Sequence, residues 1–211
     1  VDLRASVADR LFGALSNALT GFDQHELAVD AGSALLAGFA ERHGFRREEA
    51  SVALRTEPLS VGSWPSVPDV VAASEADRAA LASLHDRLFA GSHTTGARLL
   101  DGDSTVLVVR DGGDLAGYVV TEFQHDGSLY VDYVGVAETA RRRGLGGSLV
   151  SAAVAAGARA GAAHAHLTVR AGNGAARRLY GRRGFVEDRI IVPYRRGFGL
   201  DRPEPPLRPP V

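Results

Sequence analysis

The segment from Leu129 to Ser148 constrains the fold of this chain more than any other. An apolar run over 129–136 predicts a strand; three consecutive arginines and several glycines follow, and a helix-like segment begins at Gly144. Glycines let a backbone approach a ligand closely, and the free N–H groups at a helix N-terminus attract anions. This order of elements therefore predicts a site for a phosphate-bearing cofactor.

The glycine pattern differs from two common phosphate-binding motifs. The P-loop needs a lysine, and all 24 basic residues of this chain are arginine. The dinucleotide fingerprint G-x-G-x-x-G needs a third glycine, which the sequence Gly144-Leu-Gly-Gly-Ser-Leu lacks. A solvated basic turn before a glycine-rich helix start is the alternative interpretation of residues 141–147.

Composition narrows the class of protein. A chain of 211 residues holds one full domain plus an extra piece, or two very small domains. A content of 45% apolar and 23% charged residues is ordinary for a soluble globular protein. The net charge of −1 argues against generic nucleic-acid binding. Without cysteine there is no disulfide, thiol nucleophile or Cys-based zinc site. No signal peptide or membrane span is evident, so we expect a cytoplasmic protein without a membrane partner.

The residue pattern alternates between helical and strand segments. Helical periodicity predicts helices over residues 3–20, 31–43, 77–90, 144–160 and 174–183. Apolar runs predict strands over residues 52–55, 104–110, 115–124, 129–136, 165–169 and 189–194. Proline, serine and glycine predict a linker over 58–67, and a proline-rich tail occupies 201–211.

An internal repeat joins the two ends of the chain. Residues 27–45 align without gaps on residues 167–185, and matches at leucine, valine, alanine, glycine, arginine and phenylalanine share one offset. The first copy has Ala40 at the position of Tyr180 and no arginine–glycine loop before it. We therefore expect residues 1–57 to be a truncated repeat without the chemistry of the second copy. Shared helix-then-Gly-Phe patterning is the alternative explanation.

A second motif follows the arginine–glycine loop. It reads Asn173-x-x-Ala176-x-x-Leu179-Tyr180-x-x-x-Gly184-Phe185. Together with Arg141-x-x-Gly144-x-Gly146, in this order and spacing, it resembles the GNAT-type N-acetyltransferase superfamily over about residues 68–197. The repeated back half also resembles tandem acetyltransferases of the mycothiol synthase kind.

The resemblance implies a fold and a domain organisation. The fold class is α/β (α+β), with a mixed, mostly antiparallel central sheet flanked by helices and a small N-terminal α/β lobe. Residues 68–200 would form an acetyl-CoA-dependent N-acetyltransferase domain, and residues 1–57 a truncated acetyltransferase-like lobe. That lobe is expected to pack on the larger domain or to pair with a second copy.

The resemblance also implies where the co-substrate acetyl-CoA binds, between splayed strands at 129–136 and 165–169. A bulge near Val134, Gly135 and Val136 would free backbone amides for the acetyl carbonyl and the pantetheine arm. Asn173 would contact the pantetheine arm, and Tyr180 would donate a proton to the departing thiolate. The pyrophosphate would bind a loop formed by Arg141, Arg142, Arg143, Gly144, Leu145, Gly146 and Gly147.

Two carboxylates are candidates for the general base. Strand alternation puts Tyr130, Asp132 and Val134 on one face, so Asp132 would lie beside the cleft. Glu122, on the adjoining strand, is the second choice. A satisfied or solvent-facing carboxylate is the alternative at both positions.

The expected activity is direct transfer of an acetyl group from acetyl-CoA to a primary amine of a small molecule or peptide, with no metal. The alternative is a non-catalytic acyl-CoA-binding sensor or partner lobe. His85, His93 and Asp101–Asp103 could favour a cationic acceptor, or they could be surface residues. His164 and His166 share a strand face, but no third metal ligand is evident, so surface imidazoles are expected.

Overall fold

The structure is a computed structural model. It describes residues 3–18, 24–59, 64, 67, 69–92 and 94–197. Most of the predicted linker, and the whole of the predicted tail at 201–211, lie outside the described residues. The chain forms two compact units, each of which is described by itself below.

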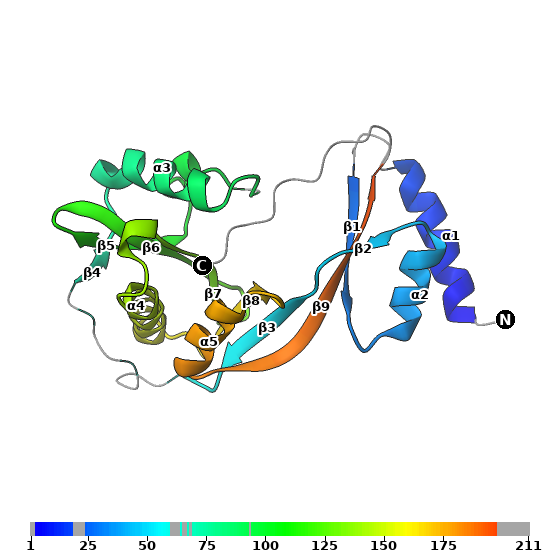
Figure 1. Ribbon diagram of the computed structural model, residues 1–211. Helices are drawn as coiled ribbons and strands as arrows, with labels where there is room; N and C mark the ends of the chain where they lie inside the picture. Colours follow the sequence, from blue (N-terminus) through cyan, green and yellow to red (C-terminus); the bar gives the residue numbers. More distant parts are fainter. Residues whose placement is uncertain are drawn as a thin grey trace. The chain divides into compact units, whose positions relative to one another are not determined.

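The larger unit is a mixed, mostly antiparallel sheet with helices on both faces, as the sequence predicted (Figure 1). Strands β4, β5, β6 and β7 pair antiparallel, and β8 joins β7 in parallel. Helix α3 packs on one face of β6 and β7, and helix α4 covers the other. Its strands and helices are β4 (Val70–Ala72), α3 (Arg78–Leu88), β5 (Thr105–Asp111), β6 (Asp114–Phe123), β7 (Leu129–Val136), α4 (Leu145–Arg159), β8 (Ala165–Arg170) and α5 (Gly174–Arg182).

Local sequence explains how the central strands form. Strand β6 is apolar on both faces because it lies in the middle of the sheet, with Tyr118, Val119 and Val120 all buried. The β5–β6 hairpin turns at Gly112 and Gly113, whose φ angles of 60° and 96° are accessible mainly to glycine. Both features agree with the predicted strands and turn.

The smaller unit contains the N-terminal segment and the far end of the last strand. Its elements are α1 (Leu3–Ala18), β1 (Gln24–Asp30), α2 (Ala34–Arg42), β2 (Arg46–Arg47) and parts of β3 (Ser51–Thr56) and β9 (Phe185–Gly197). Its core consists of Val29, Ala40, Phe45, Val192 and Tyr194, all buried.

The internal repeat is also a repeat of structure. Helix α2 and helix α5 begin and end at positions with the same offset as the sequence match. The side chains of Ser33 and Asn173 both cap their helices, by accepting backbone N–H groups at 3.4 and 3.0 Å. Gly44 and Gly184 end the two helices with φ angles of 74° and 80°. The two copies therefore share their helix start, helix length and stop.

The last strand of each copy pairs with the first strand of the other copy. Strand β9 pairs antiparallel with β1, and β3 pairs with β8. The correspondence extends to single hydrogen bonds. Ala31 donates its N–H to Ile190 O at 2.9 Å, and the repeat-equivalent Ala171 donates to Ala50 O at 2.8 Å.

The two compact units divide the chain differently from the predicted domains. The prediction placed residues 68–200 in one domain, but residues 189–197 belong to the smaller unit because β9 pairs with β1 there. Conversely, residues 54–56 of the predicted N-terminal lobe belong to the larger unit. Strands β1, β2 and β4 were not predicted, and β9 is longer than the predicted 189–194.

The contribution of β3 to the larger unit can be measured at Thr56. This buried side chain accepts the N–H of Ala165 at 2.9 Å. The substitution Thr56→Val keeps the shape but leaves that N–H unpaired, which should lower the free energy of unfolding by about 1–3 kcal/mol. Urea unfolding measures this change. Thr105→Val, on the exposed face of β5, is the control, and an equal effect of both substitutions would contradict the assigned role.

Candidate functional site

Strands β7 and β8 separate soon after they meet. In their parallel pairing, Leu129 is the partner of Ala165 and Tyr130 is the partner of His166. Both strands continue past this point, and Leu129 N donates to His164 O at 2.9 Å where they are still joined. The β7–β8 pairing therefore ends at Tyr130, and the edge of β7 beyond it is not paired with β8.

A β-bulge in β7 lies at Asp132, so the predicted position near Val134–Val136 is wrong. Val120 of β6 pairs with Tyr133 while Thr121 pairs with Val131, which makes Asp132 the extra residue. A bulge of this kind lets two consecutive side chains lie on one side of the sheet. Asp132 and Tyr133 accordingly face the same pocket, beside α3.

The bulge also changes the predicted alternation. Val134 pairs with Val119, which points to the face opposite Val120. Val134 is therefore on the opposite face from Asp132, not on the same one. The reason is the extra residue, which reverses the order of faces along the rest of the strand.

The backbone of β7 beyond the bulge presents amides at this open edge. Ala137 N donates to Ala116 O at 2.8 Å, so Ala137 points toward β6. Because backbone groups alternate in direction along a strand, the N–H groups of Val134 and Val136 point away from β6. Arg141 Nε donates to Val136 O at 3.4 Å from that same open edge. The sequence analysis attributed the free amides of this segment to a bulge. They come instead from the regular alternation of backbone groups along the strand.

Gly135 fixes this segment of β7 against the core. A Cβ at this position would lie 2.4 Å from the ring of Tyr118, which is fully buried. Tyr118 is in turn hydrogen-bonded through its hydroxyl to His85 Nδ1 at 2.7 Å. The ring has little freedom to move, so only glycine fits here and the amides beside it are held rigidly.

The arginine–glycine loop leaves the start of α4 uncapped. Gly144 adopts a φ of 83° and provides no side-chain cap, and Arg142 is also left-handed with a φ of 64°. The first helical bond recorded here joins Ser148 N to Gly144 O at 3.1 Å. The N–H groups of residues 145–147 are therefore available for an anion, and the helix dipole favours negative charge there.

The three arginines of the loop have different roles in the structure. Arg143 forms a two-bond ion pair with Asp111, so a phosphate would compete with that carboxylate for its guanidinium. This pair lowers the pKa of Asp111 and raises that of Arg143. Arg141 is partly buried against the strand end, whereas Arg142 is exposed. Arg142 is the loop guanidinium best placed to meet a ligand.

The other two glycines of the loop allow helix α4 to pack on α5. A Cβ at Gly146 would lie 3.0 Å from Leu179, and one at Gly147 would lie 2.4 Å from the guanidinium of Arg183. These glycines therefore bring the helix that carries the anion site close to the helix that carries Asn173 and Tyr180.

Helix α5 supplies the predicted asparagine and tyrosine. The side-chain oxygen of Asn173 accepts Ala176 N at 3.0 Å, which leaves its amide N–H groups for other contacts. Tyr180 is buried and contacts Phe185 edge to face, with ring centroids 5.8 Å apart. Burial raises the pKa of Tyr180 to about 12, with a smaller contribution from Tyr130. Tyr180 is therefore neutral at physiological pH.

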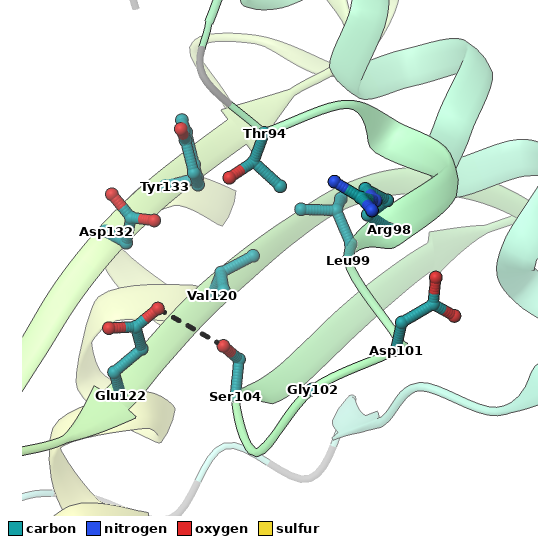
Figure 2. A pocket seen from close by; sticks show the side chains of 10 residues that line it. All are labelled: Thr94, Arg98, Leu99, Asp101, Gly102, Ser104, Val120, Glu122, Asp132 and Tyr133. Atoms are coloured by element: carbon teal, nitrogen blue, oxygen red, sulfur yellow. Dashed lines mark hydrogen bonds between the residues drawn. The ribbon is translucent and has the colours of Figure 1, made fainter.

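A pocket of about 400 Å³ lies on the α3 side of the sheet (Figure 2). It contains both predicted base candidates, Asp132 and Glu122, on the strand side. Asp132 is half-buried, whereas Glu122 is exposed and accepts Ser104 Oγ at 3.4 Å. The pocket is lined by Thr94, Arg98, Leu99, Asp101, Gly102, Ser104, Val120, Glu122, Asp132 and Tyr133.

His85 is a structural residue that the sequence analysis misjudged. It is fully buried, and besides Tyr118 it contacts Ser92 Oγ at 3.1 Å and Thr94 O at 3.0 Å. It therefore joins the wall of the pocket to the strand below, and does not face an acceptor directly. His85 follows Leu81 and Leu84 at helical spacing on the apolar face of α3. This spacing was the sequence signal that could have identified it as buried.

The remaining histidine pair contributes structure as well. The rings of His164 and His166 are 6.0 Å apart, and His166 Nε2 lies 3.1 Å from Ser128 Oγ. Within the described residues, no group of three or more His, Asp or Glu side chains is arranged to hold a metal ion. Among the described residues, no helix is both long enough and apolar enough to cross a membrane.

This geometry defines an acetyltransferase-like fold, and comparison with known proteins gives the family. The model of the acetyltransferase (GNAT) family matches residues 72–185. This match spans more than half of the 211 residues, so the protein belongs to the GNAT acetyltransferase family. A comparison with curated proteins found no match.

Solved structures share the fold. A GCN5-related N-acetyltransferase from Kribbella flavida superimposes with a TM-score of 0.70 at 23% identity, over 92% of this chain and 77% of that one. One from Sphaerobacter thermophilus gives 0.66 at 20% identity, over 93% and 68%. A tandem GNAT protein from the clavulanic acid biosynthesis pathway gives 0.64 at 15% identity, over 85% and 65%.

The anion site at α4 can be tested with a matched pair of substitutions at Gly144. Asn and Asp both tolerate the left-handed backbone and have nearly the same shape, so they differ in charge alone. We expect Gly144→Asp to weaken coenzyme A binding at least tenfold more than Gly144→Asn, because a carboxylate repels phosphate. Calorimetric titration measures this. Equal affinities in the two variants would place the phosphates elsewhere.

Proposed function

We propose that this protein transfers an acetyl group from acetyl-CoA directly to the nitrogen of a primary amine, in the cytoplasm. The observation that carries the proposal is that one strand, β7, connects two kinds of site. Its Asp132 lies in a pocket with a second carboxylate, and its open amides at Val134 and Val136 follow immediately. Membership of the GNAT family supports acetyl transfer as the reaction.

The cofactor side is supported by the donors that this chain offers. The uncapped N–H groups of residues 145–147 and the exposed Arg142 suit a pyrophosphate. The amide N–H groups of Asn173, and the open edge of β7, suit the amides of a pantetheine arm. These donors follow one another along one edge of the larger unit. An acyl-CoA carries a pyrophosphate and then amide groups, and so offers partners in the same order.

The acceptor side needs a proton acceptor. An alkylamine with a pKa near 10.4 is neutral in only about four molecules per ten thousand at pH 7. Asp132 is suited to accept the proton because the bulge points its carboxylate into the pocket, on the strand that also supplies the amides. Glu122 is a second acceptor in the same pocket, nearer to solvent.

Attack of the neutral amine on the thioester carbonyl forms a bond between nitrogen and carbon and places negative charge on the oxygen. The N–H of Val134 or Val136 would stabilise this oxyanion. The carbon–sulfur bond then breaks, and Tyr180 would donate its proton to the sulfur. Because the pKa of Tyr180 is raised to about 12, this transfer must accompany bond cleavage instead of preceding it. The proton left in excess on the acylated nitrogen would pass through water to the tyrosinate, which restores Tyr180 and leaves a neutral amide.

Direct transfer is favoured over a covalent acetyl-enzyme. The chain contains no cysteine, and none of the residues that line the pocket is a serine held by a histidine. We further propose that the smaller unit is a truncated acetyltransferase-like repeat without catalysis. Its Ala40 occupies the position equivalent to Tyr180 and is fully buried. A second copy of the chain is a candidate partner for this unit.

The assignment of the base is tested by Asp132→Asn, with Glu122→Gln as the matched control. Loss of the base should lower kcat/KM for an amine by about 10²–10⁴-fold at pH 7. The deficit should shrink as pH approaches the amine pKa, because free neutral amine then replaces the catalysed deprotonation. Steady-state assays from pH 7 to 10 measure this. A larger, pH-dependent loss in Glu122→Gln would move the role to Glu122.

The role of Tyr180 is tested by Tyr180→Phe, with Tyr194→Phe in the smaller unit as a control for loss of a buried hydroxyl. We expect kcat to fall by about 10²-fold, the low end for general acid catalysis. The deficit should be constant from pH 7 to 10, because a group with a pKa of about 12 stays protonated throughout this range. Unchanged turnover across this range would refute the role.

A further inference from the structure

The pocket that contains Asp132 has a second wall made by the loop after α3 (Figure 2). Gly96 anchors this loop, because its N–H donates to Asp86 Oδ1 at 2.8 Å and a Cβ would lie 2.5 Å from Ala82 Cα. Arg78 donates to Ala97 O at 2.7 Å. Together with the contact of His85 to Thr94 O, these bonds hold the loop wall in one conformation.

The two walls carry different charged groups, and, among the residues that the structure describes, only the loop wall contributes an arginine to the pocket. Asp132 and Glu122 put two carboxylates on the strand wall. On the loop wall, Asp101 accepts a bond from Arg78 Nη1 at 2.7 Å, and Arg78 also bonds Glu75. Arg98 is the arginine among the described residues that line this wall. Within the part of the chain that the structure describes, Arg98 forms none of the ion pairs found.

We infer that the acceptor is a small molecule with both a primary amine and a carboxylate, and that Arg98 binds the carboxylate. The inference rests on the proposed function and adds the substrate class. The amine end meets Asp132 and Glu122, while the planar guanidinium of Arg98 suits a carboxylate held by two hydrogen bonds. A volume of about 400 Å³ suits a small ligand.

A diamine or a simple alkylamine fits the charges less well. A second ammonium group would approach Arg98 and be repelled by it, whereas a methyl end would leave the guanidinium without a partner. An amino acid instead places one opposite charge against each wall. The anchored loop matters here because the backbone that carries Arg98 needs no ordering when the ligand binds, so only the arginine side chain must be fixed.

The test compares γ-aminobutyrate, butylamine and putrescine, which share one carbon-chain length and a primary amine at one end and differ at the far end; the rate for putrescine is halved because its two amines are equivalent. We expect the wild type to prefer γ-aminobutyrate to butylamine by about 10- to 100-fold in kcat/KM, the strength of one charge-assisted contact. Arg98→Met should abolish the preference, and Arg98→Lys should keep part of it. The same comparison is made for amino acids of different chain length, from β-alanine to ε-aminocaproate, each against its alkylamine. It is also made for leucine against isopentylamine.

Arg87→Met is the matched control, because Arg87 is an exposed arginine of the same region that bonds Ser83 Oγ at 2.8 Å outside the pocket. It should leave the preference unchanged. Equal turnover of carboxylate and methyl substrates, a preference for putrescine, or an unaltered preference in Arg98→Met would overturn the inference while the proposed function stands. Coenzyme A binding without acetylation of any of these amines would refute the proposed function, and the inference with it.

Discussion

The packing of Tyr118 against Gly135 is the contact on which the site depends. It presses β6 and β7 together in the part of β7 that follows its last pair with β8, and His85 bonds the tyrosine hydroxyl. Because the ring is fully buried, the backbone beside it has one available position. The open edge of β7 and the pocket beside α3 then belong to one rigid strand, and the bulge at Asp132 decides which side chains face the pocket.

Most of the fold could be predicted from the sequence, because its signals are local. The start of α5 at Asn173, its end at Gly184 and the turn at Gly112 each depend on chemistry within a few residues. The pattern of arginines and glycines likewise predicted the start of α4. These signals identify elements, and they place Tyr180 on the helix next to the loop.

What could not be predicted depends on partners distant in sequence. The position of the bulge is set by the register with β6, which no pattern within β7 reveals. Strand β1 is mostly polar and exposed, and it is a strand because β9 pairs with it. The ion pair of Arg143 with Asp111, and the burial of His85, also arise from contacts between separate elements.

The exchange of last strands sets the order in which this protein can mature on the ribosome. Strand β1 is synthesised early, yet the segment that pairs with it follows roughly 160 residues later. At typical elongation rates of about 5–20 residues per second, β1 waits some ten to thirty seconds for its partner. The first unit to appear is therefore the last to be completed, and through this interval its open strand edge is a surface that a chaperone, or a neighbouring nascent chain, can occupy.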